Sequence, residues 1–313
     1  MFLFTLYWYT AQKATHFRKS LQGKFPPPPL HGEGICVIII RDFFVPYPLI
    51  ESRKDMKNNY HTHTVRCRHA QDTEREYIEA AIAAGITTLG FADHAPQIFP
   101  GDYYSTFRMR PEELEDYCRT IRALKEEYKD RIDIKIGLEA EYYPDLFEDL
   151  IELIRPYDLD YLILGQHLDD NEIGLEHNFL PTDKEEHLIR HTSQVLRGLS
   201  TGYFTYLAHP DLVNFTGDDE TYRRHMLPFC QAIKEMDIPL EVNILGLTAK
   251  RNYPSERFYR IAAEVGNRFV LGVDAHTAGA LSDPTGEEMA REFCRKVGII
   301  PEEDVKLIPP TRK

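Results

Sequence analysis

Three histidines lie within the nine residues from position 61 to position 69, namely His61, His63 and His69. Residues two apart on a strand point to the same face, so His61 and His63 lie side by side if this segment is extended. Imidazole suits zinc, iron, copper and nickel, and two imidazoles on one face can hold a divalent ion. This segment therefore predicts a metal-binding site that other ligands must complete.

Further metal-capable side chains recur where later apolar segments end. The full set of expected ligands is His61, His63, His69, His94, Glu139, His167, His209, Asp274 and His276. Seven imidazoles without metal would leave buried donors and acceptors unpaired, at about 1–3 kcal/mol each. One tetrahedral zinc takes three or four protein ligands, so this set predicts two or three metals with a bridging carboxylate. Metals about 3.5–4 Å apart suit the displacement of a phosphoryl group.

The elements that must position these ligands alternate along the chain. Strands are expected at 58–63, 86–93, 132–139, 161–167, 203–209, 238–243 and 268–274, and helices at 73–84, 111–128, 145–154, 184–199, 220–235, 255–264 and 287–297. Nearly continuous apolar strands are typical of a parallel sheet that is buried on both faces. The pattern predicts an α/β fold, a distorted seven-stranded (β/α)7 barrel with its chemistry at the carboxyl ends of the strands.

Local signals mark the ends of two of the expected helices. Thr73 with Glu76 predicts a capping box at the start of the first helix, and Gly85 predicts its end. Pro111 occupies the first position of the second helix, where proline is favoured.

Composition excludes several classes of protein. The 313 residues carry a formal charge of −13, which argues against a nucleic-acid backbone as partner. No apolar run approaches the roughly 20 residues of a membrane span, so no membrane partner is expected. The five scattered cysteines form no CxxC pair and indicate the reducing cytoplasm, not a disulfide framework.

The first 55 residues follow a different pattern. Met1–Thr10 is apolar but lacks the basic start of a signal peptide, and the four prolines from Pro26 to Pro29 cannot join a helix or a central strand. We expect two parts: an N-terminal extension at 1–55, poorly ordered or not native, and one catalytic domain at 56–313.

The motifs in this second part carry a family resemblance. From about Met56 to about Val297 the chain resembles the PHP (polymerase and histidinol phosphatase) superfamily, and most closely its monofunctional histidinol-phosphate phosphatases. The resemblance is carried by His61-Thr62-His63-Thr64, His69, Asp93-His94-Ala95-Pro96, Gly137-Leu138-Glu139, Gly165-Gln166-His167, Ala208-His209-Pro210-Asp211 and Gly272-Val273-Asp274-Ala275-His276. The segment 107–115 also resembles this branch rather than the polymerase branch.

The resemblance implies how the ligands are divided among three divalent ions of zinc, iron or manganese. The first metal takes His61, His63, Glu139 and Asp274; the second takes Glu139, His167 and His209; the third takes His69, His94 and His276. It also implies that a hydroxide bridging the first two metals attacks phosphorus. The implied reaction is hydrolysis of L-histidinol phosphate to L-histidinol and phosphate, in histidine biosynthesis.

Three residues are expected to act in catalysis. Asp93 or His94 lies near the water network that protonates the leaving alcohol, and Arg108 contacts the substrate phosphate, unless it is only a surface arginine before a helix. Glu141 shares strand parity with Glu139, so periodicity does not choose the bridging ligand, and the Gly-x-Glu pattern of the family favours Glu139. Asn243 is expected to form hydrogen bonds behind the ligands.

Other functions remain open at this stage. A protein-tyrosine phosphatase or a nucleotide phosphoesterase on the same scaffold is one alternative, and a metal-binding module without catalysis is another. An amidohydrolase-like barrel often uses a carbamylated lysine as bridge, and no lysine ends an expected strand. The sequence gives no expectation for the oligomeric state.

Overall fold

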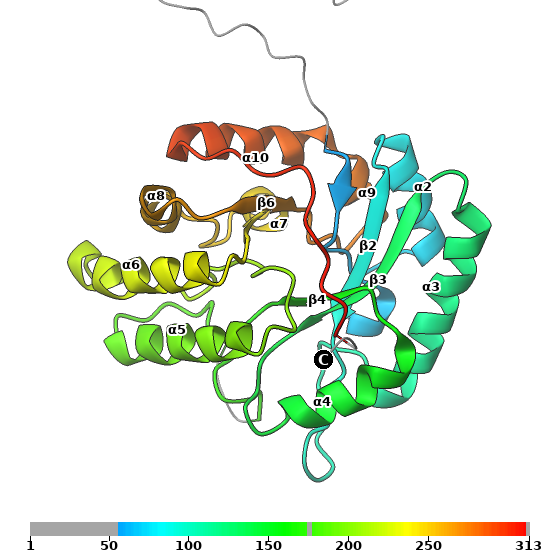
Figure 1. The fold of residues 1–313 in the computed structure, drawn as a ribbon, viewed down its shortest axis with the longest axis horizontal. Helices are drawn as coiled ribbons and strands as arrows, with labels where there is room; N and C mark the ends of the chain where they lie inside the picture. The colour runs from blue at the N-terminus through cyan, green and yellow to red at the C-terminus, as the bar shows by residue number, and fades with distance from the viewer. Residues whose placement is uncertain (1–55, 174–176, 311–313) are drawn as a thin grey trace, which may run out of the picture. The chain divides into compact units, whose positions relative to one another are not determined.

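Short parallel strands form the centre of the part of the chain that the computed structural model describes, residues 56–173 and 177–310 (Figure 1). A four-stranded sheet has the order β1-β2-β3-β4, with bounds Asn58–Asn59, Thr88–His94, Asp133–Ala140 and Tyr161–Leu164. A second sheet pairs β5 (Leu240–Asn243) with β6 (Phe269–Gly272), again in parallel. The expected N-terminal extension at 1–55 lies outside the described residues.

The expected count of seven regular strands is not confirmed, because the segment at 203–209 forms only isolated bridges. Its Leu207 bridges Leu164 of β4 on one side and Leu240 of β5 on the other. The extended backbone stops at His209, which has a φ of +29°, and at the proline that follows. A curled half-barrel of parallel strands is therefore joined to the β5–β6 pair on one side by bridges at Leu207 and on the other by the bridge between Thr62 and Ala275.

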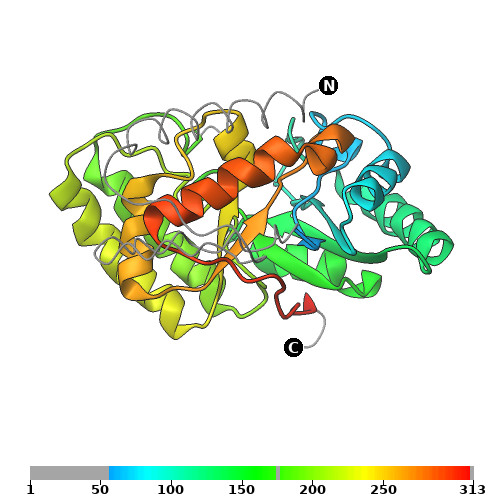
Figure 2. The same ribbon diagram turned by 90° about the horizontal axis from the view of Figure 1, so that it is seen from above.

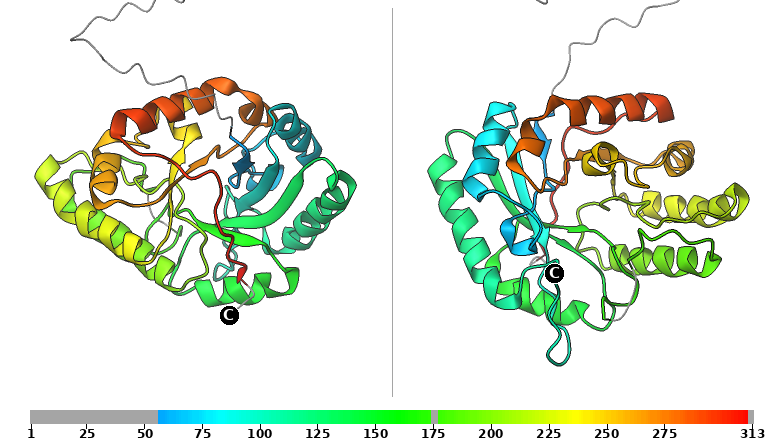
Figure 3. Two further views of the ribbon diagram at one scale, coloured as in Figure 1. Left: turned by 45° about the horizontal axis from the view of Figure 1, so that its top comes forward. Right: turned by 180° about the vertical axis from the view of Figure 1, so that it is seen from behind.

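The helices lie outside the strands, as Figures 1 and 3 show from several sides. All seven expected helices are present: α2 (Glu74–Ala83), α3 (Leu114–Tyr128), α4 (Phe147–Ile154), α5 (Glu185–Ser200), α6 (Asp219–Glu235), α8 (Glu256–Val265) and α10 (Pro284–Val297). The 3-10 turn η2 (Pro111–Glu113) forms the start of the helix expected at 111–128. Four short elements among the described residues were not expected: α7 (Ile244–Thr248), α9 (Ala278–Ser282), and the 3-10 turns η1 (Val65–Cys67) and η3 (Arg155–Tyr157). Among the described helices none has the length and apolarity to cross a membrane.

The expected helix ends are confirmed. The N–H of Thr73 donates to Glu76 Oε2 at 2.7 Å, and the Thr73 hydroxyl accepts from the N–H of Glu76, so both halves of the capping box are formed. Gly85 follows the end of α2 with a φ of +79°, a conformation that favours glycine. Pro111 occupies the first position of η2, which leads into α3.

Side chains fill the space between the strands and form a floor beneath the histidines. Tyr161 of β4 is fully buried there, and its hydroxyl donates to Tyr60 O at 2.7 Å. Glycines make room for its ring, since a Cβ on Gly137 would lie 2.5 Å from two of its carbons. The interior is thus a packed core, not a channel.

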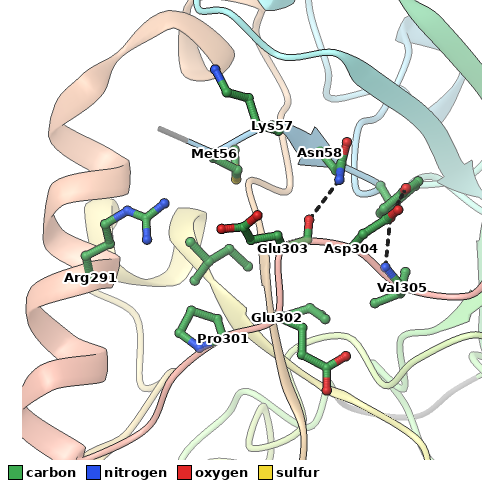
Figure 4. A pocket seen from close by; sticks show the side chains of 12 residues that line it. Met56, Lys57, Asn58, Arg291, Pro301, Glu302, Glu303, Asp304 and Val305 are labelled. Atoms are coloured by element: carbon green, nitrogen blue, oxygen red, sulfur yellow. Dashed lines mark hydrogen bonds between the residues drawn. The ribbon is translucent and has the colours of Figure 1, made fainter. Parts of the chain in front are cut away.

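The C-terminal segment closes the opposite end of the strands. After α10 the chain turns back across the β6 and β1 side of the fold (Figures 2 and 4). Asn58 Nδ2 donates to Glu303 O at 2.8 Å, and the Tyr60 hydroxyl donates to Asp304 Oδ1 at 2.5 Å. These contacts cover the amino ends of the strands, so the carboxyl ends remain for the site.

Candidate metal centre

The first two histidines follow β1 and share a face, as their spacing predicts. Backbone hydrogen bonds hold this segment against the chain after β6: His63 N donates to Ala275 O at 2.9 Å, and Ala275 N donates to His61 O at 3.1 Å. The pairing brings Asp274 between the two rings. Its Oδ1 lies 3.5 Å from His61 Nε2 and 3.0 Å from His63 Nε2, and all three side chains are buried.

Glu139 occupies the centre of the candidate site. It is the next-to-last residue of β3, and only 1% of its side chain is exposed. Its Oε1 lies 2.8 Å from His209 Nε2 and 3.6 Å from Nε2 of both His61 and His167, while Oε2 lies 2.9 Å from His94 Nδ1. Each carboxylate oxygen thus faces a different group of imidazoles, as a bridging ligand requires.

A third group of imidazoles lies beside His94. The ligand atoms of His69, His94 and His276 lie within 4.8 Å of one another, and His276 Nε2 is 2.9 Å from His69 Nε2. The ligand atoms of His61, His63 and Asp274 also lie within 4.8 Å of one another, and so do those of His61, Glu139 and His209. The structure therefore brings together all nine side chains that the strand ends predicted.

The hydrogen bonding of these side chains shows that they fit metal ions. Six buried atoms of the proposed ligands form no hydrogen bond of normal geometry within the described part of the chain, although several lie close to one another: His61 Nε2, His63 Nε2, His94 Nδ1, Glu139 Oε2, His209 Nδ1 and Asp274 Oδ1. Buried polar atoms without partners are rare in proteins, because each one costs free energy. Imidazole nitrogens and carboxylate oxygens suit divalent zinc, iron and manganese, which would satisfy these atoms together.

Electrostatics keeps key ligands in the form that binds a cation. Burial alone would raise the pKa of Glu139, but the imidazoles of His167, His94 and His61 hold it well below its usual value. Burial and the neighbouring His63 lower the pKa of His276 to about 3, and burial lowers that of His94 well below its usual value. An ionised Glu139 and neutral rings at His94 and His276 are the protonation states that metal binding requires. At His61 and His63 the neighbouring carboxylates outweigh burial, which leaves the pKa of His61 well above its usual value and raises that of His63 to about 9, so metal binding would displace protons there.

Two of the expected ligands adopt unusual backbone conformations. His209 has a φ of +29° and Asp274 has a φ of +55°, a backbone region that residues other than glycine rarely occupy. Such strain costs of order 1–3 kcal/mol and concentrates at functional sites. Here it ends an extended segment sharply and turns each side chain toward Glu139 or His63.

Sequence reasoning missed Glu241, which lies behind the ligands on β5. Its side chain is fully buried; Oε1 is 2.8 Å from His61 Nδ1, and Oε2 accepts from His209 N at 3.0 Å. Because an ionised carboxylate only accepts, His61 Nδ1 carries the proton and Nε2 faces the site. Asn243 donates to both Glu241 and Asp274, at 2.9 and 3.1 Å, in the supporting place expected for it. The available signal for Glu241 was a carboxylate two residues before Asn243 on the same strand face.

The structure corrects the expected substrate contact of Arg108. The side chain is 1% exposed and makes five hydrogen bonds, to Ala95 O and to the carboxylates of Glu141 and Glu172, which match its five N–H donors. Neither a phosphate contact nor a surface position agrees with this placement. Arg108 folds inward because Glu141 and Glu172 supply buried negative charge on both sides of it.

Asp93 is likewise buried behind the site. It accepts from the Thr64 hydroxyl and, at 2.8 Å, from His94 N, and its Oδ1 lies 3.4 Å from His63 Nδ1. Of the two residues expected near the leaving group, only His94 lines the open pocket. Asp93 is placed to orient His63 instead.

An open pocket with a volume of about 510 Å³ lies over the ligands. Besides His69, His94, Glu139, His167, Asp274 and His276, it is lined by Thr106, Phe107, His177, Phe179, Leu212, Leu245, Arg251 and Tyr253. The motifs did not single out Arg251, whose Nη1 donates to the Tyr253 hydroxyl at 2.5 Å. An arginine and aromatic rings thus face the ligands across a space that a small organic phosphate would fit.

Known proteins are similar to this chain in sequence and in fold. The model of the PHP domain matches residues 59–244. A protein of Deinococcus radiodurans named probable histidinol-phosphatase is 33% identical over 229 residues, which cover 70% of this chain and 86% of the relative. The histidinol-phosphatase of Bacillus subtilis is 28% identical over 261 residues, which cover 71% of this chain and 94% of the relative.

A solved structure supports the fold. The histidinol phosphate phosphatase of Lactococcus lactis, solved in complex with zinc, L-histidinol and phosphate, superimposes with a TM-score of 0.63 at 24% identity. The match covers 80% of this chain and 98% of that one, so nearly the whole solved fold recurs here. From the matched family model, the curated relatives and the shared fold, it follows that this chain belongs to the PHP domain family.

Proposed function

We propose that the protein is a metal-dependent phosphatase that hydrolyses L-histidinol phosphate to L-histidinol and phosphate, in histidine biosynthesis. The observation that carries this proposal is the convergence of nine imidazole and carboxylate side chains beneath one open pocket. The choice of substrate is supported by the Deinococcus radiodurans relative, which is named probable histidinol-phosphatase. It is 33% identical to this chain, and the match covers 86% of its length.

The proposed site holds three divalent ions of zinc, iron or manganese. His61, His63, Glu139 and Asp274 would hold one, Glu139, His167 and His209 a second, and His69, His94 and His276 a third. In such sites the chemistry that bound metals supply is activation of water at neutral pH and neutralisation of charge on phosphoryl oxygens.

The chain's own residues would bind and orient the substrate. Arg251 lines the pocket and can donate charge-assisted hydrogen bonds to the phosphate, while Tyr253 holds its guanidinium. Phe107 and Phe179 give the same pocket an apolar wall against which the organic part of a substrate can pack. Arg251 therefore takes the phosphate-binding role that the sequence assigned to Arg108.

The leaving alcohol needs a proton, which water in the pocket beside His94 would supply. His94 lines the pocket. Its backbone N–H donates to the Asp93 carboxylate, which lies behind the ligands and helps to fix the position of the His94 ring. We assign His94 to the surroundings of the leaving oxygen and Asp93 to the support of His63 and His94.

The test is a comparison of phosphate release from L-histidinol phosphate, from a phosphotyrosine peptide and from a nucleoside monophosphate. The protein is assayed as purified, with its metal content determined by elemental analysis. We expect L-histidinol phosphate to be hydrolysed with the highest kcat/KM, and Arg251→Ala to raise KM for it. Equal rates on all three substrates would contradict the proposed specificity, and bound metal without any turnover would favour a metal-binding module.

A further inference from the structure

Four titratable side chains form a continuous chain of hydrogen bonds beside the candidate metal centre. They are Glu172, Arg108, Glu141 and His167, from the loops that follow β4, β2, β3 and β4. Glu141 is fully buried, and Arg108 and Glu172 are 1% and 5% exposed. Only His167 at the end of this chain lines the open pocket. Three separate loops are therefore tied together at one ligand.

The guanidinium of Arg108 is fixed from two sides. Nη1 and Nη2 donate to the two oxygens of Glu141 at 2.7 and 3.0 Å, in a bidentate pair. Nε and Nη2 donate to Glu172 Oε2 at 3.0 and 2.7 Å. Because the guanidinium is planar and rigid, these contacts together set the plane of the Glu141 carboxylate.

The Glu141 carboxylate in turn fixes His167. Its Oε1 lies 2.9 Å from His167 Nδ1, and since an ionised carboxylate only accepts, Nδ1 carries the proton. In the neutral ring Nε2 is then free to bind a metal, and it lies 3.6 Å from Oε1 of Glu139. A carboxylate behind an imidazole is the arrangement that orients metal-binding histidines and raises their basicity.

The charges of this chain also favour a cation at its open end. Arg108 contributes one positive charge, whereas Glu141 and Glu172 contribute two negative charges, and all three are buried. A buried group of net negative charge is costly unless a cation lies nearby. The Nε2 side of His167 is where a bound cation would offset this negative charge.

We propose that Arg108 and Glu172 are positioning residues that act through Glu141 on His167, so that the loop after β4 sets the metal affinity of the group Glu139, His167 and His209. The proposal deepens the proposed function, but it rests only on the binding of metal at these ligands. The identity of the substrate does not enter it.

The test compares Glu141→Gln, Glu172→Gln and the double variant in titrations of metal-free protein with Co2+, followed by absorption spectroscopy. We expect Glu141→Gln to weaken the affinity by about 10- to 100-fold and to change the Co2+ spectrum. Glu172→Gln should give a smaller loss in the same direction, because it leaves the Arg108–Glu141 pair intact. The double variant should lose no more than Glu141→Gln, since both act along one route.

A matched control exists on the surface. Glu79 accepts from Arg131 at 2.9 and 2.8 Å in the same bidentate manner, but far from the ligands in the fold and with both side chains exposed. Glu79→Gln should leave the Co2+ affinity and spectrum unchanged. If Glu141→Gln does not fold, Glu172→Gln still decides, because it removes no charge from the Arg108–Glu141 pair.

The proposal is overturned if the glutamine variants lower the urea midpoint of the metal-free protein but leave Co2+ affinity and spectrum as in the parent. Additive losses of affinity in the double variant would also overturn it. These titrations contain no substrate, so an inactive parent would count against the proposed phosphatase and not against the positioning route.

Discussion

At the scale of single residues, the site depends on side chains that never touch substrate. Glu241 fixes His61 through Nδ1 and also accepts from the backbone of His209, so one carboxylate supports two proposed ligands. Carboxylates in this position raise the basicity of the imidazole and fix its tautomer.

Glu241→Gln should therefore weaken metal binding by about 10- to 100-fold. In the parent protein the backbone N–H of His209 and the side-chain amide of Asn243 both donate to Oε2 of Glu241. In the variant, an N–H₂ group would face these two donors. Competition for Zn2+ with a chromophoric chelator measures the loss. Glu288→Gln, at an exposed position on α10, is the control and should bind Zn2+ like the parent. Equal affinities of the two variants would refute the role of Glu241.

Gly165 is the second residue at this scale with a clear consequence. It precedes the Gln166-His167 motif, and a Cβ there would overlap the carboxylate of Glu139. Gly165→Ala should displace Glu139 and reduce the metal bound per chain, with a loss of phosphatase activity of about tenfold or more. Elemental analysis after dialysis tests this, and unchanged metal content would show that Glu139 can move without consequence.

At the scale of elements, the strands are held together around Tyr161. Its ring packs on Gly90 of β2 and Gly137 of β3. A Cβ on Gly137 would come within 2.5 Å of carbons of the ring. The floor of the site thus depends on two positions without side chains.

Gly137→Ala should lower the free energy of unfolding by about 1–3 kcal/mol, the usual cost of overpacking a core. Urea unfolding monitored by circular dichroism measures it. Gly279→Ala in α9 is the control, since its added Cβ meets nothing within 4 Å, and its stability should stay at or above that of the parent. A neutral Gly137→Ala would mean that the sheet relaxes around the ring.

At the scale of the whole molecule, the candidate metal centre joins segments that are far apart in sequence. Its side chains run from residue 61 to residue 276, and they lie on or soon after every described strand except β5. Bound metal should therefore stabilise the fold as well as supply the chemistry.

Removing metal with a chelator should abolish phosphatase activity and lower the melting temperature. A ligand present at 100 times its Kd contributes about 2.7 kcal/mol, which corresponds to roughly 5–10 °C for a domain of this size. Differential scanning calorimetry before and after addition of Zn2+ or Mn2+ measures the change. A metal-free protein with the melting temperature of the parent would show that the ligands are held in place without metal.

We also propose that residues 56–313 form the catalytic domain by themselves. The family match begins at residue 59, and all proposed ligands follow it. A chain starting at Met56 should keep the melting temperature and the kcat/KM of the full chain. A large loss of either would assign residues 1–55 a part in the fold or the site.

The sequence determined the local features of this protein. The seven main helices, the capping box of Thr73 and Glu76 and the chemical type of the ligands follow from periodicity and residue types, which act over a few neighbouring residues. The recurrence of imidazoles at the strand ends was enough to predict that they meet, because parallel strands bring their carboxyl ends to one side.

Only the tertiary structure decided which charged groups face the pocket. Arg108 and Arg251 are both arginines in loops, yet one is buried between Glu141 and Glu172 and the other lines the pocket. It also decided that the segment at 203–209 forms isolated bridges at Leu207 and no regular strand, and that Glu241 lies behind His61. These outcomes depend on contacts between residues 33 to 180 positions apart, which no local pattern encodes.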